Sequence, residues 1–143
     1  MKRLRLLAIG LTTTIAGFSA AQTATKRPVI EVQKPSIVAF YPPLSASDAE
    51  KPEEIESLSD FRLSIEGARK SLRAAGIEIH EVYSTSFRIR VGAKTTSFHP
   101  TEDGVGYYLI APGKPPSVEY GVMTDADLIH VAKQYFGSAK LPN

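Results

Sequence analysis

Three histidines are the side chains of this sequence that ordinarily titrate near neutral pH: His80, His99 and His130. No two of them have the four-residue spacing that places a pair of metal ligands on one face of a helix. His80 alternates with Glu78 along an expected strand, so the two side chains share a face. A metal site would require the fold to bring His80, His99 and a loop acid together. We predict no metal and no cofactor, and keep acid–base chemistry at His80 or His99 as an alternative.

Other catalytic chemistries find no support in the sequence. The chain contains no cysteine, which excludes thiol catalysis, thiolate metal sites and disulfide exchange, because each requires the sulfur atom. No Gly-x-Ser-x-Gly motif marks a serine nucleophile. Gly104-Val105-Gly106 precedes an expected strand and not a helix N-terminus, so it differs from a phosphate-binding loop. The sequence therefore favours a protein without catalytic activity.

Arginines are regularly spaced in two segments. Three of them follow one side of an expected helix: Arg62, Arg69 and Arg73. Glu66 can pair with its neighbours there, which favours a solvated, salt-bridged surface over an anion-binding stripe. Arg88 and Arg90 alternate with apolar residues in an expected hairpin, so one face of that hairpin is cationic.

The first 21 residues have the pattern of a cleaved export signal. Residues 1–5 carry three positive charges, residues 6–18 are mostly apolar, and Ser19-Ala20-Ala21 offers the small residues that signal peptidase requires. The apolar run is shorter than the roughly 20 residues that span a bilayer. We predict a signal peptide at 1–21, export to the periplasm or the medium, and no membrane span in the mature chain.

Removal of that segment changes the charge balance. Lys plus Arg falls from 17 to 14 against 15 Asp plus Glu, so the mature net charge is −1. This balance argues against a nucleic-acid partner, which needs a concentrated basic face. The remaining 122 residues suit one domain with a single core. We divide them into a flexible N-terminal segment at 22–35, in which Val29, Ile30 and Val32 can add a short edge strand, and a single α+β domain at 36–143.

The first expected elements of the domain are a strand and a long helix. The apolar run at 36–41 predicts a strand that Pro42-Pro43 closes. An acidic loop at 44–56 follows. The spacing of apolar residues then predicts a helix from about Ser57, capped by Ser57 or Ser59, to a stop at Gly76.

The second half of the chain predicts a strand, a hairpin, two further strands and a helix, at 77–83, 86–98, 107–111, 117–122 and 124–137. The hairpin turns at Gly92-Ala93-Lys94. Thr124 is the expected N-cap of the last helix, and Gly137 is its stop. The order indicates an α+β fold.

Two segments, Ser36 to Pro43 and Gly106 to Phe136, carry a resemblance to the thioredoxin-like fold. The first resembles the strand that leads into that family's active-site loop, and the second resembles its closing hairpin and helix. The resemblance implies a mixed central sheet, a C-terminal helix, and the 86–98 hairpin inserted in place of the family's middle helix. Residues 41–45, Tyr-Pro-Pro-Leu-Ser, stand where the family carries its redox cysteines. The resemblance therefore implies a scaffold without redox chemistry.

The sequence as a whole predicts an exported binding domain without catalysis. We expect its binding face at the end of the central sheet, where residues 41–43 and the loop from His99 to Gly106 converge. The candidate contact residues are Tyr41, Pro42, Pro43, His99, Arg88 and Arg90. The expected partner is an envelope protein or a small ligand, and no oligomeric state is predicted. The alternatives are a small hydrolase or lyase that uses a histidine and a carboxylate, and an assembly subunit of the envelope.

Overall fold

The computed structural model describes residues 26–101, 104–137 and 141, so the predicted signal peptide at 1–21 lies outside the described residues. The described chain is an α+β protein, as the sequence predicts, but it has two sheets and not one central sheet. One sheet has the strand order β3-β2-β6-β7, comprising Glu78–Tyr83, Ser36–Tyr41, Gly106–Ile110 and Ser117–Tyr120. The other has the order β1-β4-β5, comprising Val29–Val32, Phe87–Val91 and Lys94–Phe98. The helices are η1 (Asp48–Glu50), α1 (Pro52–Ala74) and α2 (Asp125–Phe136).

Both sheets are mixed. In the four-stranded sheet, β2 runs parallel to β3 and antiparallel to β6, and β7 is antiparallel to β6. In the three-stranded sheet, β1 is parallel to β4, and β4 is antiparallel to β5. The chain therefore crosses between two parallel strands through α1 and returns through two antiparallel hairpins.

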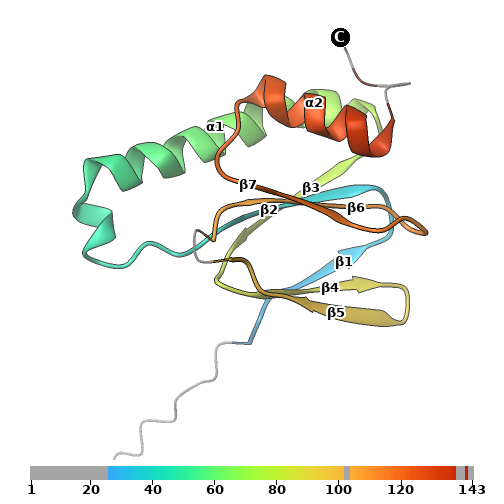
Figure 1. Cartoon of the computed structure of the whole chain (residues 1–143), viewed down its shortest axis with the longest axis horizontal. Helices are drawn as coiled ribbons and strands as arrows, with labels where there is room; N and C mark the ends of the chain where they lie inside the picture. Colours follow the sequence, from blue (N-terminus) through green and yellow to red (C-terminus); the bar gives the residue numbers. More distant parts are fainter. Residues whose placement is uncertain (1–25, 102–103, 138–140, 142–143) are drawn as a thin grey trace, which may run out of the picture.

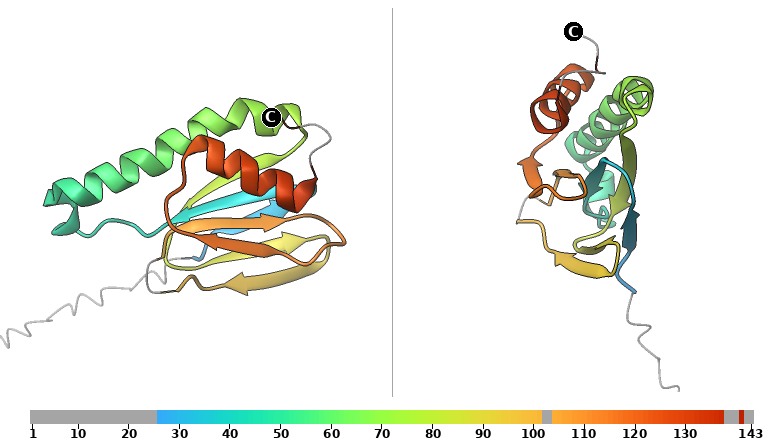
Figure 2. Two further views of the ribbon diagram at one scale, coloured as in Figure 1. Left: turned by 45° about the horizontal axis from the view of Figure 1, so that its top comes forward. Right: turned by 90° about the vertical axis from the view of Figure 1, so that its right-hand side faces the viewer.

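The molecule has three layers (Figures 1 and 2). Helices α1 and α2 lie side by side over one face of the four-stranded sheet, and the three-stranded sheet covers the opposite face. Alternate residues of β2 point into the two layers: Ile37 and Ala39 pack under the helices, whereas Val38 and Phe40 pack between the sheets. Because both faces of β2 are covered, its residues form a continuous buried run.

Helix α1 begins earlier than the sequence predicts, so a cap at Ser57 or Ser59 is wrong. Pro52 occupies the first turn, where its missing N–H costs no hydrogen bond, and Lys51 precedes it in extended conformation. The buried residues of α1 all lie from Phe61 onward. The first turns of the helix consequently project past the end of the sheets (Figure 1).

The segment at 22–35 contains the short edge strand that the apolar residues Val29, Ile30 and Val32 indicate. Residues 29–32 form β1, which pairs in parallel with β4, and the side chain of Val32 is buried between the sheets. A parallel partner so distant in the sequence leaves no local signal beyond a few apolar residues. Residues 22–25 lie outside the described part of the chain.

The local features of the second half of the chain are as the sequence predicts. The 86–98 segment forms the β4–β5 hairpin, with Phe87 and Ile89 buried and Arg88 and Arg90 on the other face. The Thr124 hydroxyl accepts a hydrogen bond from the Asp127 N–H at 3.1 Å, which caps α2.

A buried hydrogen-bond chain ties α1 to the sheet beneath it. The Ser64 hydroxyl donates to the Phe61 carbonyl at 2.8 Å, and its oxygen lies 3.0 Å from the Tyr107 hydroxyl. Because Ser64 has only one proton to donate, Tyr107 donates to Ser64 and accepts from the Met123 N–H at 3.4 Å. Burial raises the pKa of Tyr107.

The burial of Tyr107 makes the stability sensitive to alkaline pH. The unfolded chain releases the Tyr107 proton near pH 10.0, whereas the folded chain holds it to a higher pH. The free energy of unfolding should therefore fall as the pH rises above 10. The variant Tyr107→Phe should lose about 1 kcal/mol at neutral pH and show a shallower alkaline decline. Urea unfolding at a series of pH values measures both, and Tyr120→Phe, at an exposed tyrosine, should keep the full decline.

Candidate functional site

The two loops that the sequence places at the end of the central sheet do meet there. A Cβ atom at Gly104 would lie 3.3 Å from Cγ of Pro42. Gly104 also has φ +62°, a conformation that favours glycine. The sheet end is thus built by the residues that follow β2 and those that precede β6.

Tyr41 does not lie on this face, and its placement among the contact residues is wrong. Its side chain is only 2% exposed. The ring lies 5.2 Å from that of Phe61, and the hydroxyl donates to Ser57 Oγ at 3.2 Å. Tyr41 belongs to the row of β2 residues that faces α1, which covers it. Its neighbour across the strand pair, Tyr83, is 39% exposed because β3 is an edge strand.

The other predicted contact residues fall on separate surfaces. Pro43 and His99 are exposed. Arg88 and Arg90 lie on the outer face of the three-stranded sheet, and Arg90 forms an ion pair with Glu31 at 2.7 Å. The predicted contact residues therefore do not share one face, because Pro42 and the two arginines lie on different surfaces.

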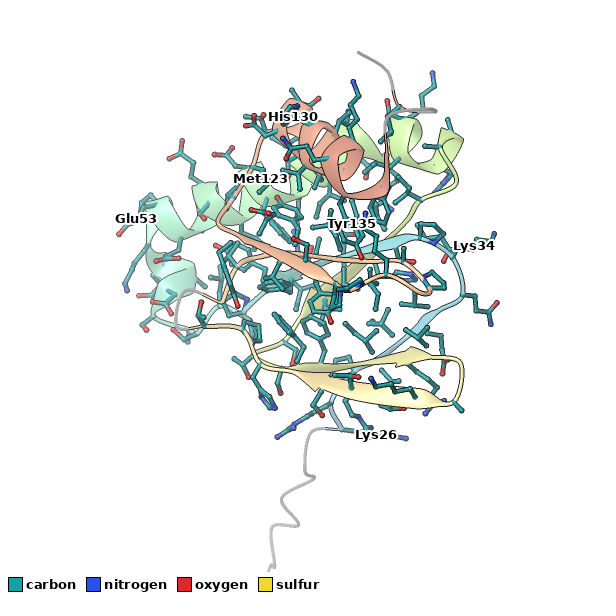
Figure 3. The ribbon with its side chains drawn as sticks, turned by 45° about the vertical axis from the view of Figure 1, so that its right-hand side comes forward. Lys26, Lys34, Glu53, Met123, His130 and Tyr135 are labelled. Carbon is teal, nitrogen blue, oxygen red and sulfur yellow. The ribbon has the colours of Figure 1, made fainter. Side chains whose placement is uncertain are left out.

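The histidines do not assemble a metal centre in the described residues. Nε2 of His80 lies 3.5 Å from a Glu78 carboxylate oxygen but forms no hydrogen bond. His130 contacts Gln134 and lies on the outer side of α2, away from both sheets (Figure 3). Within 26–101, 104–137 and 141, no three acidic or histidine side chains gather around a point that a metal ion could occupy.

A different surface combines exposed apolar side chains with an ordered polar network. Ile55 and Leu63 of α1 are 51% and 66% exposed, and they border an open hollow of about 560 Å³. Arg62, which also lines the hollow, contacts the exposed Tyr83 of β3. We call this the α1–β3 surface, and define it by Ile55, Leu58, Arg62, Leu63, Glu66, Glu81 and Tyr83.

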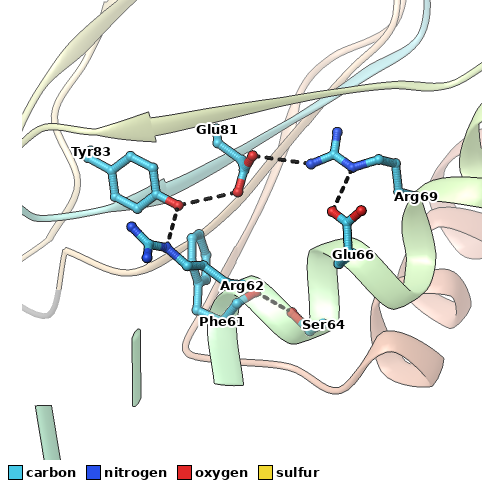
Figure 4. Close-up of polar contacts among 7 residues, drawn as sticks. All are labelled: Phe61, Arg62, Ser64, Glu66, Arg69, Glu81 and Tyr83. Atoms are coloured by element: carbon cyan, nitrogen blue, oxygen red, sulfur yellow. Dashed lines mark hydrogen bonds and ion pairs between the residues drawn. The ribbon is translucent and has the colours of Figure 1, made fainter. Parts of the chain in front are cut away.

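Polar side chains hold the rim of the α1–β3 surface in place (Figure 4). The Tyr83 hydroxyl accepts from Arg62 Nε at 3.3 Å and donates to Glu81 at 3.2 Å. The Arg62 guanidinium also lies 5.3 Å from the centre of the Tyr83 ring. Arg69 bridges Glu81 and Glu66, with both ion pairs at 3.1 Å. The network fixes the orientation of Tyr83 and leaves its ring accessible.

The same contacts decide between the two interpretations of the helical arginines. Hydrogen bonding to Tyr83 raises the pKa of Arg62, and pairing with Glu66 raises the pKa of Arg69. Both guanidinium groups are already engaged within the chain: Arg69 forms the predicted salt bridges, whereas Arg62 bonds to the Tyr83 hydroxyl. An anion-binding stripe would require them to be free.

No protein-family model, curated protein or solved structure matches this chain. In the part of the chain that the structure describes, no helix has both the length and the apolarity to cross a bilayer. We therefore infer the function from the exposure and the contacts of the residues at the α1–β3 surface.

The sequence does contain a signal for the α1–β3 surface. The buried face of α1 includes Phe61, Ile65, Ala68 and Leu72. Leu63 is two residues from Phe61, which places it about 200° around the helix, on the polar side. A leucine at the centre of a polar helix face is the pattern that indicates a contact surface.

Proposed function

We propose that this chain is an exported, non-catalytic interaction domain that binds an envelope protein through the α1–β3 surface. The observation that carries the proposal is the exposure of Ile55 and Leu63 around one hollow, next to the edge strand β3 with its exposed Tyr83. Large apolar side chains gathered beside ordered charged groups are typical of protein contact sites. The pattern of residues 1–21 supports export.

We also propose that the scaffold is thioredoxin-like. The strand order β3-β2-β6-β7, with α1 connecting the parallel pair and α2 following β7, supports this assignment. The β4–β5 hairpin occurs between β3 and β6, where the resemblance places an insertion. Since the chain has no cysteine, such a scaffold would act by binding and without redox chemistry.

The partner that fits this surface supplies an extended segment. β3 is an edge strand, and within the described residues only β2 pairs with it. A strand added to β3 would gain main-chain hydrogen bonds, and its alternate side chains would reach the hollow beside Leu63. The rim charges, Arg62, Glu66 and Glu81, would limit the registers that the added strand can adopt.

The variant Leu63→Asp tests the proposal. A charge at the most exposed apolar residue of the surface should weaken binding by about 2 kcal/mol, or roughly thirtyfold, because it must be desolvated on contact. The folded state should be unaffected, since residue 63 points to solvent. The measurement is capture of envelope proteins by the immobilised chain, with quantitative mass spectrometry, followed by titration of the captured protein.

The matched control is Tyr120→Asp, which introduces the same charge at an exposed residue of the opposite edge strand, β7. It should capture the same protein as the unaltered chain. Capture that survives Leu63→Asp, or that is lost equally with both variants, would refute the α1–β3 surface as the binding site. An empty capture by the unaltered chain would contradict a protein partner.

A further inference from the structure

The space between the two sheets is filled unevenly along the strands. At one end, rings from β2, β4, β5 and β6 pack at centroid distances of 4.8 to 5.7 Å: Phe40, Phe87, Phe98 and Tyr108. At the other end the facing side chains are aliphatic or small. Because stacked sheets lie about 10 Å apart, short side chains do not fill the space that rings fill.

A hollow of about 280 Å³ lies at this second end. Its walls are Ile89 and Val91 of β4, Thr96 of β5, and Tyr108 and Ile110 of β6. Ile89, Tyr108 and Ile110 are buried, so the hollow reaches into the inter-sheet core. The β4–β5 and β6–β7 turns lie at the same end of the molecule and form its mouth (Figure 1).

Two lysines stand at this mouth. Lys94 begins β5, and Lys114 lies in the turn between β6 and β7. Lys114 Nζ lies 4.3 Å from the centre of the Tyr135 ring and donates to the Tyr135 carbonyl oxygen, so its ammonium group is already engaged by α2. Among the described carboxylates, none lies within ion-pair distance of either lysine. The mouth is therefore positively charged.

We propose that this hollow, the inter-sheet pocket, binds a small amphipathic carboxylate. The aliphatic chain enters between Ile89, Val91 and Ile110, and the carboxylate remains at the mouth with Lys94, because the Lys114 ammonium group is engaged by α2. The volume lies just below the range of about 300–1,000 Å³ found for drug-sized ligands, so the ligand is the size of octanoate and much smaller than a phospholipid. The pocket opens at the end of the strands opposite to the projecting turns of α1, and is independent of the α1–β3 surface (Figure 1).

Titration with octanoate, below the concentration at which it self-associates, tests the pocket. Methyl NMR spectra of the isotope-labelled chain should show saturable shifts of Ile89, Val91 and Ile110, and no comparable shift of Ile65, which lies in the other core layer. Octylammonium has the same chain and the opposite charge, and should bind at least tenfold more weakly. Absence of saturable shifts, shifts centred on Ile65, or equal binding of the two head groups would overturn the proposal.

Two variants separate the contributions of charge and shape. Lys94→Gln should weaken octanoate binding three- to tenfold, and should remove most of the preference over octylammonium. Lys70→Gln, at an exposed lysine of α1, is the matched control and should bind as the unaltered chain does. Val91→Phe should fill the hollow and abolish binding of both probes. Unchanged octanoate affinity in Lys94→Gln, with circular dichroism showing a folded chain, would refute the assigned mouth.

Discussion

Replacement of Tyr41 by alanine should lower the free energy of unfolding by about 3–5 kcal/mol, which is a large part of the total stability of a domain of this size. The Tyr41 ring is almost fully buried and packs against Phe61, which in turn contacts the rings of Tyr83 and Tyr107. Its removal would leave a cavity between β2 and α1. Because these neighbours come from both the sheet and the helix, they cannot collapse into the space without moving α1.

The conservative variant Tyr41→Phe separates the ring from its hydroxyl. It removes only the bond to Ser57, which is partly accessible, and should cost about 1 kcal/mol or less. Urea denaturation followed by circular dichroism measures both variants. A Tyr41→Ala variant that unfolds at the same urea concentration as Tyr41→Phe would show that the ring does not support the core. Partner binding by Tyr41→Ala must be compared with that of the unaltered chain at equal concentrations of folded protein.

Local chemistry explains the elements that the sequence predicts correctly. Thr124 can cap α2 because its hydroxyl reaches an N–H within the first turn. Gly92 allows the tight turn of the β4–β5 hairpin through its φ of +58°. Gly76 ends α1 with φ +79°, and Ile77 N–H then bonds to the Leu72 carbonyl. Each of these features depends on residues only a few positions apart, so it can be recognised in a single sequence.

The features that the sequence leaves open or predicts incorrectly depend on contacts between distant parts of the chain. β1 forms a strand because it pairs in parallel with β4, which lies almost sixty residues later in the chain. Tyr41 and Tyr83 are paired residues with the same side chain, and only the position of β3 at the sheet edge exposes one of them. The inter-sheet pocket likewise requires two separate hairpins to turn at the same end of the molecule. Strand order is set by global packing, and residue patterns constrain it weakly.

At Gly106, the neighbouring strand and a buried ring leave no space for a Cβ atom. A Cβ atom there would lie 2.3 Å from the Glu119 carbonyl oxygen and 2.9 Å from Cζ of Phe40. The first contact is with the backbone of β7, which is paired to β6 at this residue, and the second is with a buried ring. Neither neighbour can rotate away, because a paired strand and a packed ring have no free space beside them. Glycine is required here by packing, since its φ is not positive.

The variant Gly106→Ala should therefore lose about 3 kcal/mol or more of stability, through separation of β7 from β6 and displacement of Phe40. Gly113→Ala is the matched control: Gly113 has φ +77° with no atom within 4 Å of the added Cβ, so only backbone strain of about 1 kcal/mol is expected. Thermal and urea unfolding of both variants give the comparison. If Gly106→Ala lowers the stability no more than Gly113→Ala does, β7 must move away from β6 at little cost in free energy. The β6–β7 hairpin would then be too easily deformed to form one wall of an inter-sheet pocket of fixed shape.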